Sequence, residues 1–225
     1  MRIAVIGTGM VGQSLAGGLA GVGHDVVVGT RDPDSTIARR DPDAMGAPGF
    51  GVWHDDHGHV PVLPSGDAAD GADVVINATN GVNSLAALDL VGPERLAGRV
   101  LLDVANALDF TTTPPSLAQL DAPSLGEAIQ GRFPTARVVK SLNTMNAGVM
   151  TQPGLVGDGS HSVFVCGDDE SAKDVVRSLL GDLGWRDVID LGDITAAGTV
   201  EALLPLWLRL MGTLGTPLLQ FRIDR

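Results

Sequence analysis

Apolar residues along the chain fall into two alternating patterns, short and nearly continuous runs and longer segments with apolar positions at helical spacing. The short runs predict strands that are buried on both faces. Eight such strands are expected, at residues 2–7, 24–30, 60–63, 73–79, 99–106, 136–143, 161–167 and 186–192. Strands that alternate with helix-length connections predict an α/β fold with a doubly wound, mainly parallel sheet.

The segments between these runs predict the helices. Helical spacing is clearest at residues 10–23, 82–91, 125–133, 169–184 and 199–215, and Gly23 is placed to end the first of them. Residues 32–59 are rich in Asp, Pro, Gly and His, which indicates a helix followed by an irregular excursion. A Pro- and Thr-rich loop is expected through Pro115. After the turn at residue 152 the pattern restarts, so we expect a first domain at 1–152 and a small α/β C-terminal extension at 153–225.

Composition narrows the classes of function. The 225 residues carry a formal net charge of −12, which repels phosphate backbones and argues against a nucleic-acid partner. The single cysteine, Cys166, excludes a disulfide framework and is expected to be a small buried residue within a strand. The opening apolar run is too short for a signal peptide, and no uninterrupted run reaches the length of a membrane span. We therefore expect a cytoplasmic protein with reduced thiols and no membrane partner.

A glycine motif follows the first predicted strand. Residues 7–12 read Gly-Thr-Gly-Met-Val-Gly, a complete G-x-G-x-x-G between a strand and a helix. In this motif Gly7 permits the tight turn, Gly9 lets a pyrophosphate approach the backbone, and Gly12 lets the helix pack on the strand. The amides at the helix start then face the phosphates. The motif predicts a Rossmann-type site for a dinucleotide.

The end of the second strand bears on the choice of dinucleotide. An acid usually stands there and binds the ribose 2′-hydroxyl of NAD, but this chain has Thr30 and Arg31. A hydroxyl and a planar guanidinium suit a 2′-phosphate, which favours NADP(H). In the alternative interpretation, Asp32 is the ribose-binding acid and Arg31 points to solvent.

Four segments together give the chain a family resemblance. They are residues 7–31 (GTGMVGQSLAGGLAGVGHDVVVGTR), 138–150 (VVKSLNTMNAGVM), 163–176 (VFVCGDDESAKDVV) and 200–215 (VEALLPLWLRLMGTLG). On these segments the chain resembles the NADPH:coenzyme F420 oxidoreductases and their relatives. The resemblance implies hydride transfer between NADP(H) and the deazaflavin coenzyme F420.

The resemblance also implies roles for individual residues. Those expected around the pyrophosphate and the 2′-phosphate are Thr8, Gly9, Met10, Val11, Thr30 and Arg31. Those expected along the ribose, the diphosphate and the nicotinamide are Ala78, Thr79, Asn80, Asn106, Met145 and Ala147. The closing helix is expected to help form the deazaflavin pocket through Leu206, Trp207 and Met211, although Trp207 and Met211 also suit an ordinary core.

Direct hydride transfer needs no catalytic side chain and no metal, since the two cofactors carry the reactive carbons. Two other functions stay open at this point. In one, the chain reduces a different acceptor with NADPH, such as a flavin, a ferric chelate or an imine. In the other, it binds NADPH as a sensor without turnover.

Three further features complete the predictions. His54, His57 and His59 lie among acidic residues and could bind a metal, but a solvated loop is favoured. Lys140, at the end of a strand and next to Ser141, could approach a ligand, but a position at the surface is favoured. The closing helix carries few charges, so it either packs on the first domain or joins two subunits, and a homodimer is expected.

Overall fold

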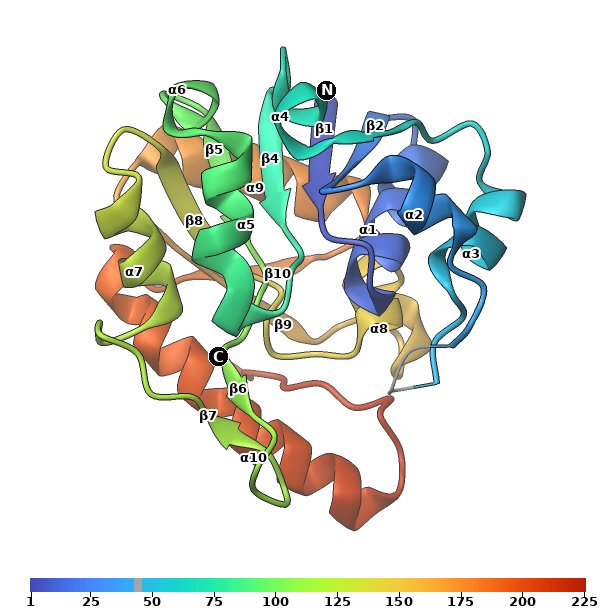
Figure 1. The fold of residues 1–225 in the computed structure, drawn as a ribbon. Coiled ribbons are helices and arrows are strands. Elements are labelled where there is room, and N and C mark those ends of the chain that lie inside the picture. Colours follow the sequence, from blue (N-terminus) through green and yellow to red (C-terminus); the bar gives the residue numbers. More distant parts are fainter. Residues whose placement is uncertain (43–45) are drawn as a thin grey trace.

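An eight-stranded sheet forms the centre of the molecule (Figure 1). The computed structural model describes residues 1–42 and 46–225. The sheet strands are β1 (Arg2–Ile6), β2 (Asp25–Thr30), β3 (Val62–Pro64), β4 (Val74–Asn77), β5 (Val100–Asp103), β8 (Arg137–Ser141), β9 (Ser162–Cys166) and β10 (Asp187–Asp190). They lie in the order β10-β9-β8-β5-β4-β1-β2-β3, and every neighbouring pair is parallel except β8 and β9. The predicted fold class and all eight predicted strands are confirmed.

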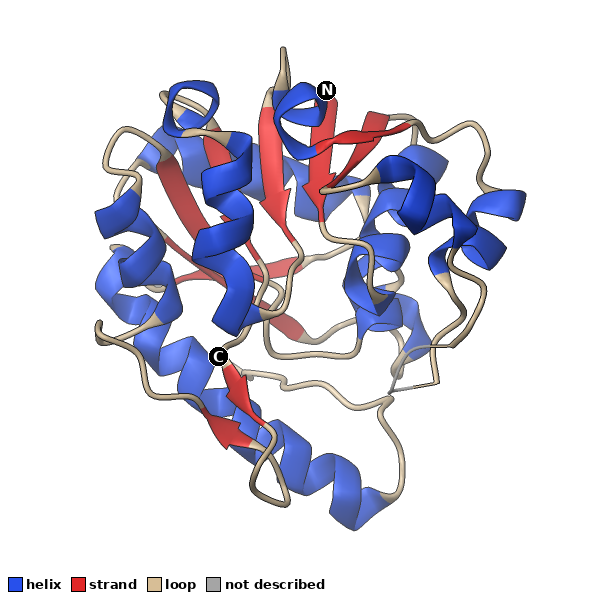
Figure 2. Cartoon of the chain, viewed as in Figure 1, coloured by secondary structure: helices blue, strands red, loops and turns tan. Residues whose placement is uncertain are grey.

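Alternate residues of the central strands enter two separate cores, which explains their continuous apolar runs. In β1, Ile3 and Val5 belong to one core, while Ala4 and Ile6 belong to the other. Because successive side chains of a strand point to opposite faces, a sheet covered on both sides needs apolar residues at every position. Figure 2 shows helices on both sides of the strands.

The helices divide between these two faces. The first core contains residues of α1 (Met10–Gly21), α3 (Phe50–Asp56), α8 (Ala147–Thr151) and α9 (Glu170–Asp182). The second core contains residues of α4 (Ser65–Ala69), α5 (Ser84–Val91), α6 (Pro93–Leu96), α7 (Leu125–Arg132) and α10 (Ala197–Leu214). The remaining helix, α2 (Pro33–Ala38), follows β2. As predicted, α1 ends before Gly23, which has a φ of +94°.

The order of the strands places a crevice at one edge of the sheet. The chain runs outward from β1 through β2 to β3, and then returns to β4 on the other side of β1. In open α/β sheets, ligands bind beyond the carboxyl ends of the strands where the strand order reverses. That point lies here between β1 and β4.

The segment after residue 152 extends the same sheet. Its strand β9 lies beside β8, and β10 lies beside β9 at the edge of the sheet. Helix α10 packs beyond the carboxyl ends of β5 and β8, where Glu201 contacts Lys140 (Figure 1). Within the part of the chain that the structure describes, one stretch, Ile194–Leu214, has the length and apolar composition of a membrane-spanning helix, and 33% of its most apolar window is buried inside the chain. The same test is met by core helices of proteins that cross no membrane.

Two segments differ from the sequence predictions. The solvated loop expected around His54 is wrong, because α3 covers Phe50–Asp56 and packs the fully buried Phe50 into the first core. The loop expected before Pro115 contains a small antiparallel hairpin, β6 (Leu108–Asp109) and β7 (Ser116–Leu117), which contacts α10.

Candidate functional site

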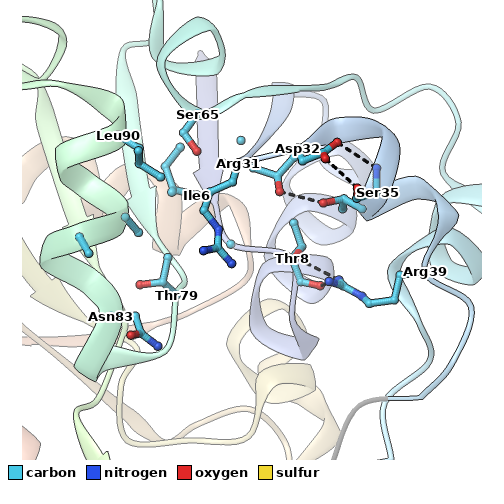
Figure 3. Close-up of a pocket in the computed structure, with 16 residues that line it drawn as sticks. Ile6, Thr8, Arg31, Asp32, Ser35, Arg39, Ser65, Thr79, Asn83 and Leu90 are labelled. Carbon is cyan, nitrogen blue, oxygen red and sulfur yellow. Dashed lines mark hydrogen bonds between the residues drawn. The ribbon is translucent and has the colours of Figure 1, made fainter.

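A pocket of about 670 Å³ opens at the strand-order reversal, beyond the carboxyl ends of β1, β2 and β4 (Figure 3). Its walls come from the turn after β1, the end of β2, α2, the turn after β4, and α5. The side chains labelled in Figure 3 are Ile6, Thr8, Arg31, Asp32, Ser35, Arg39, Ser65, Thr79, Asn83 and Leu90.

Two of the three glycines in the turn after β1 meet a steric limit, and the third lies beside free space. Gly7 has a φ of +129°, and a Cβ there would lie 2.3 Å from the Ala78 carbonyl oxygen. A Cβ at Gly12 would lie 2.1 Å from the Gly7 carbonyl oxygen, so this glycine lets α1 approach the turn. A Cβ at Gly9 would meet no atom within 4 Å, so the space beside it is free for a ligand.

Helix α1 begins directly at this free space. Gly9 is its N-cap, and no side chain caps the amides of its first turn. These amides and the positive end of the helix dipole form a suitable site for an anion. The turn therefore fits an anion such as a dinucleotide pyrophosphate. Thr8 lines the pocket, while Met10 and Val11 do not, and the contacts of these three residues with a pyrophosphate stay predictions.

The end of β2 supplies a cation and a hydroxyl group, and α2 adds a second hydroxyl. Arg31 is exposed and its guanidinium extends into the pocket (Figure 3), while the Thr30 hydroxyl lies 2.8 Å from that of Thr36. Asp32 caps α2, since its carboxylate accepts from the Ser35 amide at 3.0 Å and the Ser35 hydroxyl at 2.7 Å. The Ser35 amide, together with the Ser35 hydroxyl, lowers the Asp32 pKa below its ordinary value. The carboxylate is thus engaged within its own helix, which weakens the alternative in which Asp32 binds the ribose.

A second arginine, which the sequence analysis missed, reaches the glycine turn. Arg39, just after α2, donates to the backbone carbonyl and to the hydroxyl oxygen of Thr8, both at 3.0 Å. Arg39 also borders a smaller neighbouring cavity of about 410 Å³, on the side of Gly9 and Gln13. The only local signal was the pair Arg39-Arg40 in a segment that otherwise predicted an excursion.

Three loops at the carboxyl edge carry the other predicted dinucleotide contacts. Thr79, after β4, lines the pocket and donates its hydroxyl to the Asn77 side-chain oxygen at 2.7 Å. Asn106, after β5, forms a reciprocal pair with Asn143, after β8, at 2.7 and 3.0 Å. Asn80 caps a short turn of helix, and Ala78 is buried. Because β5 lies between β4 and β8, these loops are neighbours.

Met145 and Ala147 lie farther along the same edge. Both are buried, and the Ala147 carbonyl accepts from the Ser14 hydroxyl at 2.7 Å, so the start of α8 is fixed to α1. Neither residue, nor Asn106, lines the 670 Å³ pocket. Their proposed contacts with the nicotinamide stay predictions.

The three residues predicted for the acceptor pocket do not share one environment. Trp207 is 6% exposed and donates its indole N–H to the Leu219 carbonyl at 3.2 Å, whereas Leu206 is 49% exposed. Met211 is half-buried. None of the three lines the 670 Å³ pocket, and their role toward an acceptor stays a prediction.

Lys140 is the clearest error of the sequence analysis, which expected it at the surface. Its side chain is fully buried, and Nζ lies 2.7 Å from Asp103 Oδ2 and 3.0 Å from Glu201 Oε1. Burial alone would lower the Lys140 pKa, but the Asp103 and Glu201 carboxylates hold it above its ordinary value. These two carboxylates explain how a charged side chain can be buried here.

The histidines of α3 and the following turn make other contacts. His57 stacks on Trp53, with ring centroids 4.4 Å apart, and His54 Nε2 lies 3.2 Å from the Val60 carbonyl oxygen. Among residues 1–42 and 46–225, no group of three or more His, Cys, Asp or Glu side chains is arranged to hold a metal ion.

Comparison with known proteins agrees with this geometry. The model of the coenzyme F420-dependent NADP oxidoreductase family matches residues 2–107. A crystal structure of a protein from Arthrobacter sp. FB24, provisionally assigned as an F420-dependent NADP reductase, is 53% identical over the full length of both chains, with a TM-score of 0.95. The chain belongs to the coenzyme F420-dependent NADP oxidoreductase family.

Two curated relatives differ in how much of their length is matched. The F420-dependent NADP reductase of Methanocaldococcus jannaschii is 26% identical over 92% of this chain and 90% of its own length. Metalloreductase STEAP3 of Rattus norvegicus is 30% identical over 92% of this chain, but this chain spans only 38% of that protein. The match to the family model contains every residue that lines the pocket, and it ends before α10.

Proposed function

We propose that this member of the family is an NADP(H)-dependent oxidoreductase that transfers a hydride between NADP(H) and coenzyme F420. The observation that carries the proposal is the placement of Arg31 and Arg39 at a glycine turn with free space for a pyrophosphate. When bound, the dinucleotide supplies the hydride from its nicotinamide ring. The chain's own residues bind and orient it.

The preference for NADP(H) over NAD(H) rests on the end of β2. Arg31 extends into the pocket, which Thr30 and Ser35 also line, and no acid stands at the position that usually binds a ribose hydroxyl. A charge-assisted hydrogen bond contributes about 1.5–3 kcal/mol, which corresponds to roughly 10- to 150-fold in affinity. One such contact is enough to set cofactor preference.

In this proposal the loops after β4, β5 and β8 orient the nicotinamide half of the dinucleotide. Their polar side chains are held by one another, as in the Asn106–Asn143 pair, so little ordering is left to occur on binding. Hydride transfer between two rings needs close, fixed stacking and a site from which water is excluded. In this proposal the apolar helix α10 covers that part of the site.

Coenzyme F420 is favoured as the acceptor by the lengths of the relatives. The Arthrobacter protein matches this chain from end to end, and the archaeal reductase matches over 90% of its length. Both matches therefore include the first domain and the C-terminal extension of this chain. The match to the metalloreductase, in contrast, spans only 38% of that protein. Reduction of a ferric chelate is the second candidate, because that protein is 30% identical to this one.

The test follows NADPH oxidation by the purified chain at about 340 nm with coenzyme F420, FMN, ferric citrate or buffer alone. We expect steady oxidation with F420 that far exceeds the rate in buffer, and much slower oxidation when NADH replaces NADPH. If NADPH were oxidised as fast with FMN or ferric citrate as with F420, the proposal that F420 is the acceptor would be wrong. Tight binding of NADPH without oxidation in any mixture would favour a sensor.

A further inference from the structure

Three charged side chains form a buried cluster beyond the pocket, and hydride transfer as proposed above does not use them. The cluster consists of Asp103 at the end of β5, Lys140 in β8 and Glu201 in α10, which we call the Lys140 cluster. Lys140 Nζ donates to Asp103 Oδ2 at 2.7 Å, to the Ala105 carbonyl at 2.5 Å and to Glu201 Oε1 at 3.0 Å. All three charged side chains are nine-tenths or more buried.

Glu201 ties the closing helix to the rest of the molecule through this cluster. Its carboxylate also accepts from the backbone amides of Leu125 and Gly126, at 2.9 and 3.1 Å, at the start of α7. Glu201 is the only acidic residue of α10, a helix that otherwise buries Ala197, Val200, Leu204 and Trp207. The position of α10 along its own axis is therefore set by a directional, charged contact in addition to apolar packing.

On its other side the cluster reaches the pocket. Asp103 Oδ1 accepts from the Asn77 side-chain amide at 2.8 Å, and Asn77 accepts from the Thr79 hydroxyl at 2.7 Å. Thr79 lines the pocket. An unbroken series of hydrogen bonds thus joins a residue of the pocket wall to helix α10.

A second, uncharged layer repeats the arrangement. Asn106 lies three residues after Asp103, and Asn143 lies three residues after Lys140. The Asn143 side chain donates to Asn106 at 3.0 Å and to the carbonyl of Val200, the neighbour of Glu201, at 3.2 Å. Both layers connect the same three elements, namely the end of β5, the end of β8 and the first half of α10.

Burying three charged groups costs free energy, and apolar residues of similar size often give equal or better stability. The cluster therefore calls for a reason other than stability. We propose that Lys140 and Glu201 are positioning residues that hold the Asn106–Asn143 pair and helix α10 around the nicotinamide end of bound NADP(H). This inference rests on the proposed binding of NADP(H), but it does not depend on which acceptor receives the hydride.

The test compares two ligands that differ only in the nicotinamide. Dissociation constants of NADPH and of 2′-phospho-ADP-ribose are measured by calorimetry, and the fluorescence anisotropy of bound NADPH reports how firmly the nicotinamide is held. The main variant is Glu201→Gln, which keeps the shape of the side chain and removes its charge. Asn143→Ala removes the uncharged layer and leaves the charged cluster intact. Glu170→Gln is the matched control, because Glu170 is an exposed acid at the start of α9 that pairs with Lys173 and Arg177 and not with the Lys140 cluster.

We expect Glu201→Gln and Asn143→Ala to bind 2′-phospho-ADP-ribose within about 2-fold of wild type. NADPH binding should weaken roughly 3- to 10-fold, with lower anisotropy of the bound nicotinamide, and the control should change neither value. Equal loss of both ligands, or no loss of NADPH, in both variants would overturn the positioning role alone. A wild-type chain that binds neither ligand would overturn the proposed function and this inference with it.

Discussion

The Arg39 guanidinium contacts Thr8 at two atoms, the backbone carbonyl and the hydroxyl oxygen, each at 3.0 Å. The two residues are 31 positions apart, and the contact brings a cation from beyond α2 onto the turn that precedes α1. The glycine turn therefore carries a side-chain cation in addition to its backbone amides. The Arg39 guanidinium and the backbone amides both attract an anion.

This contact predicts that Arg39→Ala weakens binding of NADPH and NADH alike. Thr8 belongs to the turn expected at the pyrophosphate, a group that both dinucleotides share. Loss of one charge-assisted contact of about 1.5–3 kcal/mol should raise each dissociation constant at least 10-fold, as measured by calorimetry. Arg132→Ala is the matched control, because Arg132 pairs with Asp89 on α5, away from the pocket. If Arg39→Ala weakened the binding of NADPH alone, Arg39 would have to contact the 2′-phosphate instead of the pyrophosphate.

Arg31→Ala should separate the two dinucleotides. Arg31 extends into the pocket at the end of β2, where the 2′-phosphate is expected, so its loss should raise the Michaelis constant for NADPH roughly 10-fold or more and leave that for NADH nearly unchanged. Asp32→Ala is the informative companion variant. Because Asp32 caps α2, we expect it to lower stability modestly, by about 1 kcal/mol. A selective loss of NADH binding in Asp32→Ala would instead support Asp32 as the ribose-binding acid.

Substitutions of Gly9 and Gly12 should distinguish an effect on NADPH binding from an effect on stability. In Gly9→Ala the new methyl group meets no protein atom within 4 Å but fills the space beside the α1 amides, so NADPH binding should be lost at a nearly wild-type melting temperature. In Gly12→Ala the methyl group would lie 2.1 Å from the Gly7 carbonyl oxygen, so both stability and binding should fall. Gly21→Ala, at the end of α1 with no neighbour within 4 Å, is the control for helix propensity. Unchanged NADPH affinity in Gly9→Ala would contradict a pyrophosphate at this turn.

The sheet could be predicted from the sequence because its signals are local. Each strand is a continuous apolar run, and the residues that produce the run, such as Ile3 to Ile6, are the ones that the two cores bury. The glycine turn is local as well, since the steric limits at Gly7 and Gly12 arise within one strand–turn–helix unit and its neighbouring strand.

What the sequence could not predict depends on partners that are distant along the chain. Lys140 ends a strand like many surface lysines, and only the fold brings Asp103 and Glu201 to its ammonium group. Arg39 gives no sign of its contact with Thr8 for the same reason. Helix α3 is a different case, because its Gly, His and Asp residues have weak helix propensity, and burial of Phe50 in the first core decides its structure.

Cys166 should make the stability of the protein depend on alkaline pH. Burial raises the pKa of its thiol to about 12, whereas an unfolded chain ionises it near pH 8.5. Between these values the unfolded state has lost a proton that the native state keeps, so the free energy of unfolding should fall by about 1.4 kcal/mol per pH unit as pH rises above about 9. The chain has no tyrosine, and the titration of its two lysines is common to wild type and Cys166→Ala, so it cancels in the comparison. Denaturant unfolding of wild type and Cys166→Ala between pH 8 and 11 measures the effect as a difference in slope. Parallel curves for the two proteins would mean that the thiol ionises equally easily in both states.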